Sequence, residues 1–190
     1  MKIPGLLLVG GLVSLSLPCS AQAPFSKRLG DYPQRLAPYV PSPQAIVDKM
    51  LEMAELKPGE LLYDLGCGDG RIPITAAQRY RARGICVEIA EALVRSAEQQ
   101  VRRANLQDLV KVIHADIMEV DLNSADVVTI YLETSSNDKL KPVFERKLKP
   151  GARVVSHDFA VRGWTPIRTE KLESYNRSHI IYVYEMPGRK

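Results

Sequence analysis

The sequence predicts an α/β fold, in which helices cover both faces of a mostly parallel, seven-stranded sheet. Seven short apolar runs can be strands, and helical segments of about 10–15 residues alternate with the early ones. The first run, Leu61–Leu65, leads straight into a loop with three glycines and then into a helix. Ligands of such sheets bind at the carboxyl ends of the strands, so the residues that follow each strand are the candidates for function.

The order of the elements follows from apolar spacing and from Pro-Gly stops. A helix is expected from Pro43, capped by Ser42, because apolar residues recur at helical spacing until Lys57-Pro58-Gly59 ends the pattern. The last two strands can pair as a hairpin, with the final strand antiparallel to the rest. The expected strands are 61–65, 83–88, 110–113, 125–132, 152–156, 167–172 and 179–185, and the later helices are 71–80, 91–104 and 139–148.

Size and charge indicate one ordinary globular domain. The chain has 190 residues, of which 45% are hydrophobic, and its net charge is +4. Acidic and basic residues are interspersed, and no basic run suggests a nucleic-acid partner. We therefore expect no nucleic acid among the partners, and a monomer.

The first 23 residues have the pattern of a secretory signal peptide. A positive start precedes the apolar run Leu6–Leu17, and Ala21-Gln22-Ala23 follows as a cleavage site, with the cut after Ala21 or Ala23. The apolar run is too short to span a bilayer comfortably, so no stable membrane span is expected after cleavage. This predicts export to the periplasm or the medium; an uncleaved tether or a cytoplasmic protein is the alternative. Residues 24–42 form a proline-rich arm, and residues 43–190 form the domain.

Two cysteines remain after the signal segment. Cys67 lies in the glycine loop and Cys86 lies inside an apolar run. They could form one disulfide. Their positions favour two free thiols instead.

The glycine loop is the sharpest functional signal. It reads YDLGCGDGR from Tyr63 to Arg71, and glycines at alternate positions let a ligand approach the backbone closely. The helix behind it offers free N–H groups, and Glu88, at the end of the second strand, can accept hydrogen bonds from both hydroxyls of a ribose. The spacing does not match the dinucleotide fingerprint G-x-G-x-x-G, and Asp69 would repel a pyrophosphate. These features predict a ligand that contains adenosine.

This loop resembles motif I of the class I S-adenosylmethionine (SAM) methyltransferases, which have a Rossmann-like fold. Further similar segments are Glu88, His114-Ala115-Asp116, Asp126-Val127-Val128 and the turn Leu148–Ala152. The resemblance implies SAM as the cofactor. It implies a cofactor site of Asp64, Gly66, Cys67, Gly68, Gly70, Glu88, Ile89, Asp116 and Ile117.

A narrower group is also similar. The segments PYVPSP (38–43), VVTIYLE (127–133) and SHDF with a later W-x-P (156–166) resemble bacterial relatives of the mitochondrial protein-lysine methyltransferases that modify an ATP-synthase subunit and an ADP/ATP carrier. This implies N-methylation of a protein lysine. In that group the segment with Tyr39 and Pro41 closes over the cofactor and the lysine.

The acceptor side is expected at the ends of the fourth and fifth strands. A lysine is almost wholly protonated near pH 7, so the site must help it to lose a proton. The candidates are Glu133, His157 and Asp158, with Tyr131 shaping the methyl channel and Trp164 as a pocket wall or a core residue; no metal is expected. Two alternatives stay open: a small-molecule methyltransferase, and an exported, non-catalytic module that binds a nucleoside.

Overall fold

The protein is described by a computed structural model that covers Met1 and residues 39–188. The predicted signal peptide and most of the predicted proline-rich arm lie outside the described residues. Within the described part, no helix combines the length and the apolar character that a membrane span requires.

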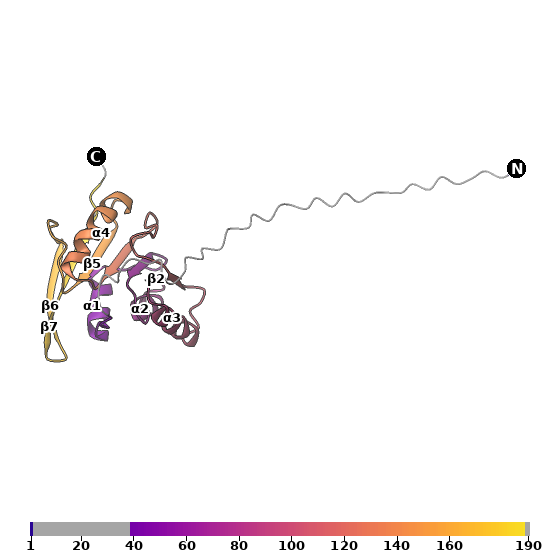
Figure 1. Cartoon of the computed structure of the whole chain (residues 1–190), viewed down its shortest axis with the longest axis horizontal. Coiled ribbons are helices and arrows are strands. Elements are labelled where there is room, and N and C mark those ends of the chain that lie inside the picture. The colour runs from indigo at the N-terminus through magenta and orange to yellow at the C-terminus, as the bar shows by residue number, and fades with distance from the viewer. Residues whose placement is uncertain (2–38, 189–190) are drawn as a thin grey trace. The chain divides into compact units, whose positions relative to one another are not determined.

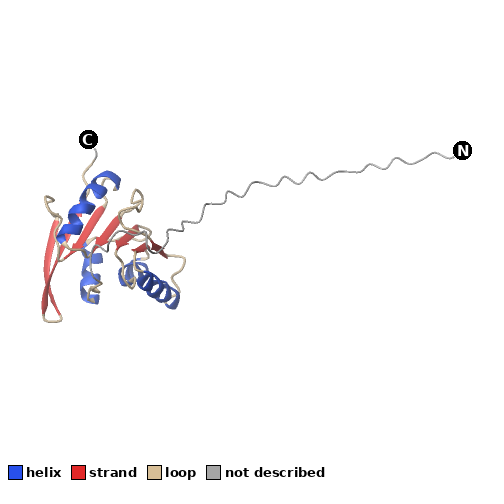
Figure 2. Ribbon diagram, viewed as in Figure 1, coloured by secondary structure: helices blue, strands red, loops and turns tan. Residues whose placement is uncertain are grey.

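A single seven-stranded sheet forms the centre of the fold, in the order β3-β2-β1-β4-β5-β7-β6 (Figures 1 and 2). The first five strands pair in parallel, and β7 is antiparallel to both β5 and β6. The predicted fold class is confirmed. The strands are β1 (Leu61–Leu65), β2 (Arg83–Glu88), β3 (Val110–His114), β4 (Val127–Ile130), β5 (Arg153–His157), β6 (Arg168–Ser174) and β7 (Arg177–Glu185).

Helices cover both faces of the sheet, as expected. Helices α1 (Gln44–Met53) and α2 (Arg71–Tyr80) bury their apolar sides in one core cluster together with Leu62 and Val127. Helix α3 (Glu91–Arg103) lies beside α2, against β2 and β3. Helix α4 (Thr134–Lys147) packs on the opposite face, where Leu140, Val143 and Phe144 join the larger core cluster (Figure 1).

The strand order reverses between β1 and β4. From β1 the chain winds outward through β2 and β3, then returns to place β4 on the other side of β1. The connections from these two strands leave in opposite directions, so a crevice opens at their carboxyl ends. The glycine loop follows β1, and Tyr131 follows β4. The predicted cofactor loop and the predicted acceptor residue therefore lie at the same end of the sheet.

Two details of the helices differ from the expectation. Ser42 does not cap α1, since the cap position is Pro43 and makes no side-chain hydrogen bond. Helix α4 begins at Thr134, five residues before the predicted start. Its first buried positions are Ser136 and Asn137, and because these side chains are polar, the apolar spacing alone does not reveal the first turn.

The β6–β7 hairpin extends the sheet on the side away from β3 (Figure 1). Ser174 pairs with Arg177, which leaves a two-residue turn of Tyr175 and Asn176. Both have positive φ (50° and 57°), as a tight hairpin of this kind requires. The hairpin matters for function because β7 places His179 beside the end of β5.

Candidate functional site

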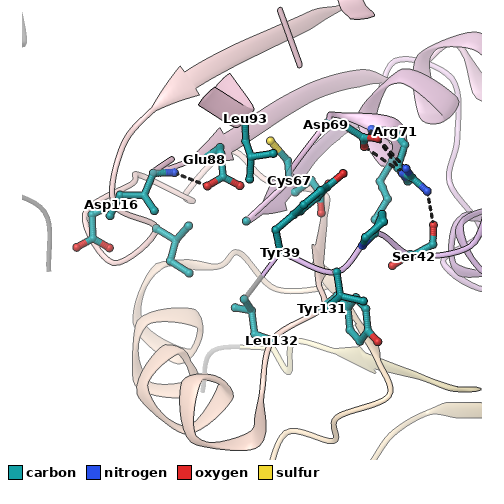
Figure 3. A pocket seen from close by; sticks show the side chains of 17 residues that line it. Tyr39, Ser42, Cys67, Asp69, Arg71, Glu88, Leu93, Asp116, Tyr131 and Leu132 are labelled. Carbon is teal, nitrogen blue, oxygen red and sulfur yellow. Dashed lines mark hydrogen bonds and ion pairs between the residues drawn. The ribbon is translucent and has the colours of Figure 1, made fainter. Parts of the chain in front are cut away.

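A pocket of about 900 Å³, its open mouth included, lies at the carboxyl ends of the central strands (Figure 3). Five segments that are far apart in the sequence form it: residues 39–42, the loop after β1, the end of β2 with the start of α3, the segment after β3 and the segment after β4. Ten of the predicted site residues line it: Tyr39, Pro41, Asp64, Gly66, Cys67, Glu88, Ile89, Asp116, Ile117 and Tyr131.

The glycine loop has the backbone that its sequence predicts. Gly66, Gly68 and Gly70 have φ of 80°, 58° and 82°, in the left-handed region that other L-residues rarely adopt. At Gly68 space is also a requirement, because a Cβ there would collide with the ring of Tyr39. The loop thus needs glycine both for its turn and for the close approach of the arm.

Glu88 ties this loop to β2. Its carboxylate accepts hydrogen bonds from the Gly68 N–H (3.0 Å), the Ile89 N–H (2.9 Å) and the Ala90 N–H (2.8 Å). The side chain is buried yet lines the pocket (Figure 3). Each carboxylate oxygen can accept more than one hydrogen bond, so the same group can hold the loop and still receive ligand hydroxyls.

Asp64 and Asp116 are two further buried carboxylates in the pocket wall. Asp64 accepts a 2.7 Å hydrogen bond from the Thr129 hydroxyl, and burial raises its pKa to about 7. Asp116 accepts from the Met118 N–H at 2.9 Å, so it also fixes the turn after β3. A buried carboxyl with a raised pKa lacks a cationic partner, which is the environment that an ammonium ligand would complete.

Arg71 fastens the arm to the loop. The Arg71 guanidinium donates to both oxygens of Asp69, with the shortest contact at 2.7 Å, and also to the Ser42 carbonyl at 2.7 Å (Figure 3). Tyr39 lies over the loop, and burial, followed by the Asp69 carboxylate, raises the pKa of its hydroxyl. Arg71 therefore links the cofactor loop to the segment that covers it.

Cys67 and Cys86 form a disulfide, which corrects the expectation of two free thiols. Their Cα atoms lie 5.3 Å apart, within the range that a disulfide spans. The expectation was wrong because β2 pairs in parallel with β1. This pairing places Cys86, in the interior of β2, next to the loop after β1, which contains Cys67. The disulfide joins the pocket loop to the strand that carries Glu88.

At the other end of the pocket, Tyr131 leads to a cluster of polar side chains. Its hydroxyl donates to Asp158 Oδ2 at 3.2 Å, and its ring stacks on His157 at 3.8 Å between centroids. His157 is fully buried, and this burial lowers its pKa to about 4. His157 and Asp158 are brought together behind Tyr131 and do not themselves line the pocket.

Two predicted residues lie elsewhere. Glu133 is exposed at the start of α4 and is not part of the pocket wall. Trp164 packs against Phe144 and Tyr184, and its indole N–H donates to Glu145 at 2.9 Å. Trp164 was expected to be either a pocket wall or a core residue, and the structure places it with the core.

Several wall residues were not predicted. Ser42 lies in the segment PYVPSP, and Asp69 and Arg71 lie in the glycine loop. Only the contacts in the structure show that these residues connect the arm to the loop. Leu93 and Leu132 add apolar surface from the first turn of α3 and from the segment after β4. His179, in the cluster behind Tyr131, had no local signal, because its position depends on the pairing of β7 with β5.

These residues fit SAM. Glu88 would hold the ribose, the apolar side chains of Ile89, Leu93 and Ile117 would enclose the adenine, and Asp64 would face the cationic amino end. When bound, SAM supplies a methyl group on a positively charged sulfur. Asp64 is buried and makes no ion pair among the described residues, and this favours a cationic ligand over a neutral nucleoside.

Comparison with known proteins agrees with this site. The model of the ANTKMT methyltransferase domain family matches residues 64–168. A protein-lysine N-methyltransferase of Saccharolobus islandicus is 43% identical over 80% of this chain and 96% of that protein. The adenine nucleotide translocase lysine N-methyltransferase of Mus musculus is 32% identical over 71% of this chain and 59% of that protein.

A solved structure carries the cofactor product. It is a protein of Salinibacter ruber, described as an RNA methyltransferase, in complex with S-adenosyl-L-homocysteine. It has 43% sequence identity and a TM-score of 0.76, over 80% of this chain and 96% of that one. The alternative of a non-catalytic binding module has no support among these relatives. The chain belongs to the ANTKMT methyltransferase domain family, and it is a methyltransferase that uses SAM.

Proposed function

We propose that this enzyme methylates the side-chain amine of lysine in a protein. The observation that carries the proposal is the pairing of Tyr131 with Asp158 at the acceptor end of the cofactor pocket. Two relatives named as lysine methyltransferases, from Saccharolobus islandicus and Mus musculus, support the same acceptor.

The charge of this end suits a protonated amine. Burial acts to raise the pKa of Asp158, but the Ile180 N–H, His157 and His179 outweigh it, and the pKa lies below its ordinary value. Asp158 is therefore a carboxylate at neutral pH. The Tyr131 hydroxyl donates its hydrogen to this carboxylate. The lone pairs of the Tyr131 oxygen can therefore accept a hydrogen bond from an incoming ammonium group.

The proton of the lysine is not taken up by Tyr131, His157 or Asp158 at neutral pH. His157 has a pKa of about 4, and the pKa of Asp158 is lowered, so neither is a strong base near pH 7. Burial, followed by the Asp158 carboxylate, raises the pKa of Tyr131, which stays protonated. We assign these residues the binding and orientation of the amine, while partial desolvation in the pocket favours its neutral form and the proton leaves to water.

The test is methyl transfer to a defined acceptor. Tritiated SAM is incubated with the enzyme and a degenerate peptide library that has one central lysine. The matched library has arginine at that position, and a structured RNA is a third sample. Label that enters the lysine library alone supports the proposal. Label in RNA, with none in peptide, would overturn it and would give this chain the acceptor that is named for the Salinibacter protein.

For the cellular location we propose an oxidising compartment reached by export. The pattern of residues 1–23 supports it, and so does the disulfide, because disulfides persist outside the reducing cytosol. A fusion of the full chain to alkaline phosphatase, which is active only after export, tests this. A fusion that is produced at full length but has no phosphatase activity would contradict export and would favour a cytoplasmic enzyme with a reduced Cys67.

A further inference from the structure

A chain of buried polar side chains lies behind the acceptor end of the pocket. It consists of Ser42 from the arm, His157 and Asp158 from the end of β5, and His179 from β7. Ser42 Oγ lies 2.9 Å from His157 Nδ1, and His157 Nε2 lies 2.8 Å from His179 Nδ1. His179 Nδ1 in turn lies 3.3 Å from Asp158 Oδ2. Ser42, His157 and His179 are buried, so each of these contacts needs a defined donor.

The positions of the protons follow from the partners. Asp158 is ionised and can only accept, so His179 Nδ1 carries a proton, which it shares between Asp158 and His157. His157 Nε2 is then an acceptor. Because His157 is uncharged, its single proton lies on Nδ1 and is donated to the Ser42 hydroxyl. The reverse tautomers would set a lone pair of His179 Nδ1 against Asp158 Oδ2 at 3.3 Å, which is closer than His157 Nε2, at 3.5 Å from the same oxygen.

The same carboxylate receives the pocket residue. Asp158 Oδ2 also accepts from the Tyr131 hydroxyl at 3.2 Å and from Arg177 at 2.9 Å, while Oδ1 accepts from the Ile180 N–H at 3.0 Å. Asp158 has φ of 61°, a conformation that is costly for a residue other than glycine. The contacts from β7 hold it there.

The Asp158 turn is supported from the opposite side as well. The Asn137 amide donates to the Phe159 carbonyl at 2.9 Å, and the Ser156 hydroxyl donates to the same carbonyl at 2.5 Å. The residue after Asp158 is thereby fixed to α4 and β5. The direction of its carboxylate is set from β7, by the Ile180 N–H, by Arg177 and by the buried His179.

We propose that His179 is a positioning residue for methyl transfer. It holds the Asp158 carboxylate so that the Tyr131 hydroxyl faces the acceptor amine, and it aligns His157, which stacks under the Tyr131 ring. The arm that covers the cofactor has an anchor of its own, the hydrogen bond from Arg71 to the Ser42 carbonyl. This inference rests on the proposed lysine acceptor, and it assigns to the hairpin strand β7 a part in the reaction that the cofactor pocket does not reveal.

Two substitutions of similar shape test it. His179→Asn keeps a nitrogen donor close to the position of Nδ1, whereas His179→Leu has a similar volume and no donor. Ser178→Ala, at an exposed neighbour on β7, is the control. The measurements are kcat and KM with the lysine peptide library and the Kd for SAM by calorimetry, each on samples shown to be folded by their thermal transition.

We expect His179→Leu to lower kcat about tenfold, the effect of one lost hydrogen bond to a charged group, with the Kd for SAM unchanged. His179→Asn should recover most of that loss, and Ser178→Ala should match the unaltered enzyme. Equal activity of the Leu and Asn variants, or a loss of SAM binding in step with kcat, would overturn the inference. So would activity that depends on added Zn²⁺ and disappears with EDTA, since the two histidines and Asp158 would then be metal ligands.

The failure of this inference is distinct from that of the proposed function. If the unaltered enzyme methylates the lysine library and both His179 variants equal it, only the role of His179 is refuted. If the unaltered enzyme binds SAM but leaves every lysine unmodified, the proposed acceptor fails and the role of His179 fails with it.

Discussion

The two ends of the pocket are built in different ways. At the cofactor end, side chains bond to backbone: one carboxylate, that of Glu88, accepts three N–H groups from the loop and from its own turn. At the acceptor end, side chains bond to one another across strands, from Tyr131 to Asp158 to His179. The first arrangement is local and is encoded in a short motif. The second exists only when β7 has paired with β5, so it depends on the whole sheet.

This difference separates binding from turnover. Changes at the cofactor end should alter the affinity for SAM. Changes at the acceptor end should alter the rate with SAM already bound. The predictions below test that separation, beginning with the largest expected effect.

Glu88→Ala should produce the largest loss. It removes the acceptor for ribose hydroxyls and leaves three buried N–H groups without their partner, and hydrogen bonds to charged groups contribute about 1.5–3 kcal/mol each. We expect the Kd for SAM to rise about a hundredfold by calorimetry. Glu98→Ala, an exposed carboxylate on α3, is the control. An unchanged Kd in the Glu88 variant would show that this carboxylate serves the loop alone.

Asp64→Asn should weaken the binding of SAM and yet stabilise the free protein. The pKa of Asp64 is about 7 in the fold and near 3.8 when exposed, so between these values the folded state holds a proton that the unfolded state has lost. Stability therefore falls as the pH rises from about 4 to about 7, by up to about 4 kcal/mol. The Asn variant escapes this loss and should melt at a higher temperature at pH 8.

The same pKa predicts how SAM binding depends on pH. If the cationic end of SAM pairs with the Asp64 carboxylate, the affinity of the unaltered enzyme should fall about tenfold from pH 8 to pH 6, as the group becomes protonated. The Asn variant should bind more weakly at pH 8 and show a flatter profile. Asp108→Asn, at an exposed position, controls for a general effect of charge. Parallel profiles of variant and unaltered enzyme would contradict the assignment of Asp64.

Reduction of the Cys67–Cys86 disulfide should act on stability more than on binding. A bridge between residues 19 apart in sequence limits the unfolded chain, and its loss should cost about 3 kcal/mol, seen as a lower melting temperature in dithiothreitol. The affinity for SAM should fall only a few-fold, because Gly66 and Cys67 also donate to the Val87 carbonyl. A double variant with serine at both positions should not respond to dithiothreitol. A response equal to that of the unaltered protein would mean that the bridge is not the cause.

Arg177→Gln should have the smallest effect. Its guanidinium pairs with Asp158 at 2.9 Å, but its side chain is 56% exposed, and exposed ion pairs contribute about 0–1 kcal/mol. We expect kcat to fall a few-fold, with a smaller difference at high salt. Arg162→Gln, which removes an exposed ion pair with Asp138, should leave kcat unchanged. A fall in kcat of a hundredfold would instead place Arg177 in direct contact with the acceptor.

The residues that the sequence assigns to the cofactor lie together in the structure, for a physical reason. Glycines that need positive φ, and an acid at the end of the next strand, are local requirements, and each one leaves its residue type in the chain. The predicted bounds of α2 and β2 coincide with those in the structure. Ten of the predicted residues line one pocket.

The acceptor end could not be predicted in the same way. His157 and Asp158 were chosen because they lie at the end of the fifth strand. In the structure His157 is buried, uncharged and bonded to His179 and Ser42. These two partners are more than 20 and more than 110 positions away in the sequence, so the sequence around His157 does not reveal them. The disulfide was missed for a similar reason, since the pairing of β2 with β1 decides which interior residue meets the loop. Glu133 was chosen by its position after β4, and the early start of α4 leaves it exposed at the helix N-terminus.

The most direct test of the separation compares Glu88→Gln with His179→Leu in single-turnover methylation of the lysine library over a range of SAM concentrations. We predict a crossed result. The Glu88 variant should need far more SAM and then reach nearly the full rate, whereas the His179 variant should saturate at the normal SAM concentration with about a tenth of the rate. If both variants lost the same parameter, whether affinity or maximal rate, the two ends of the pocket would not act separately and the account would be contradicted.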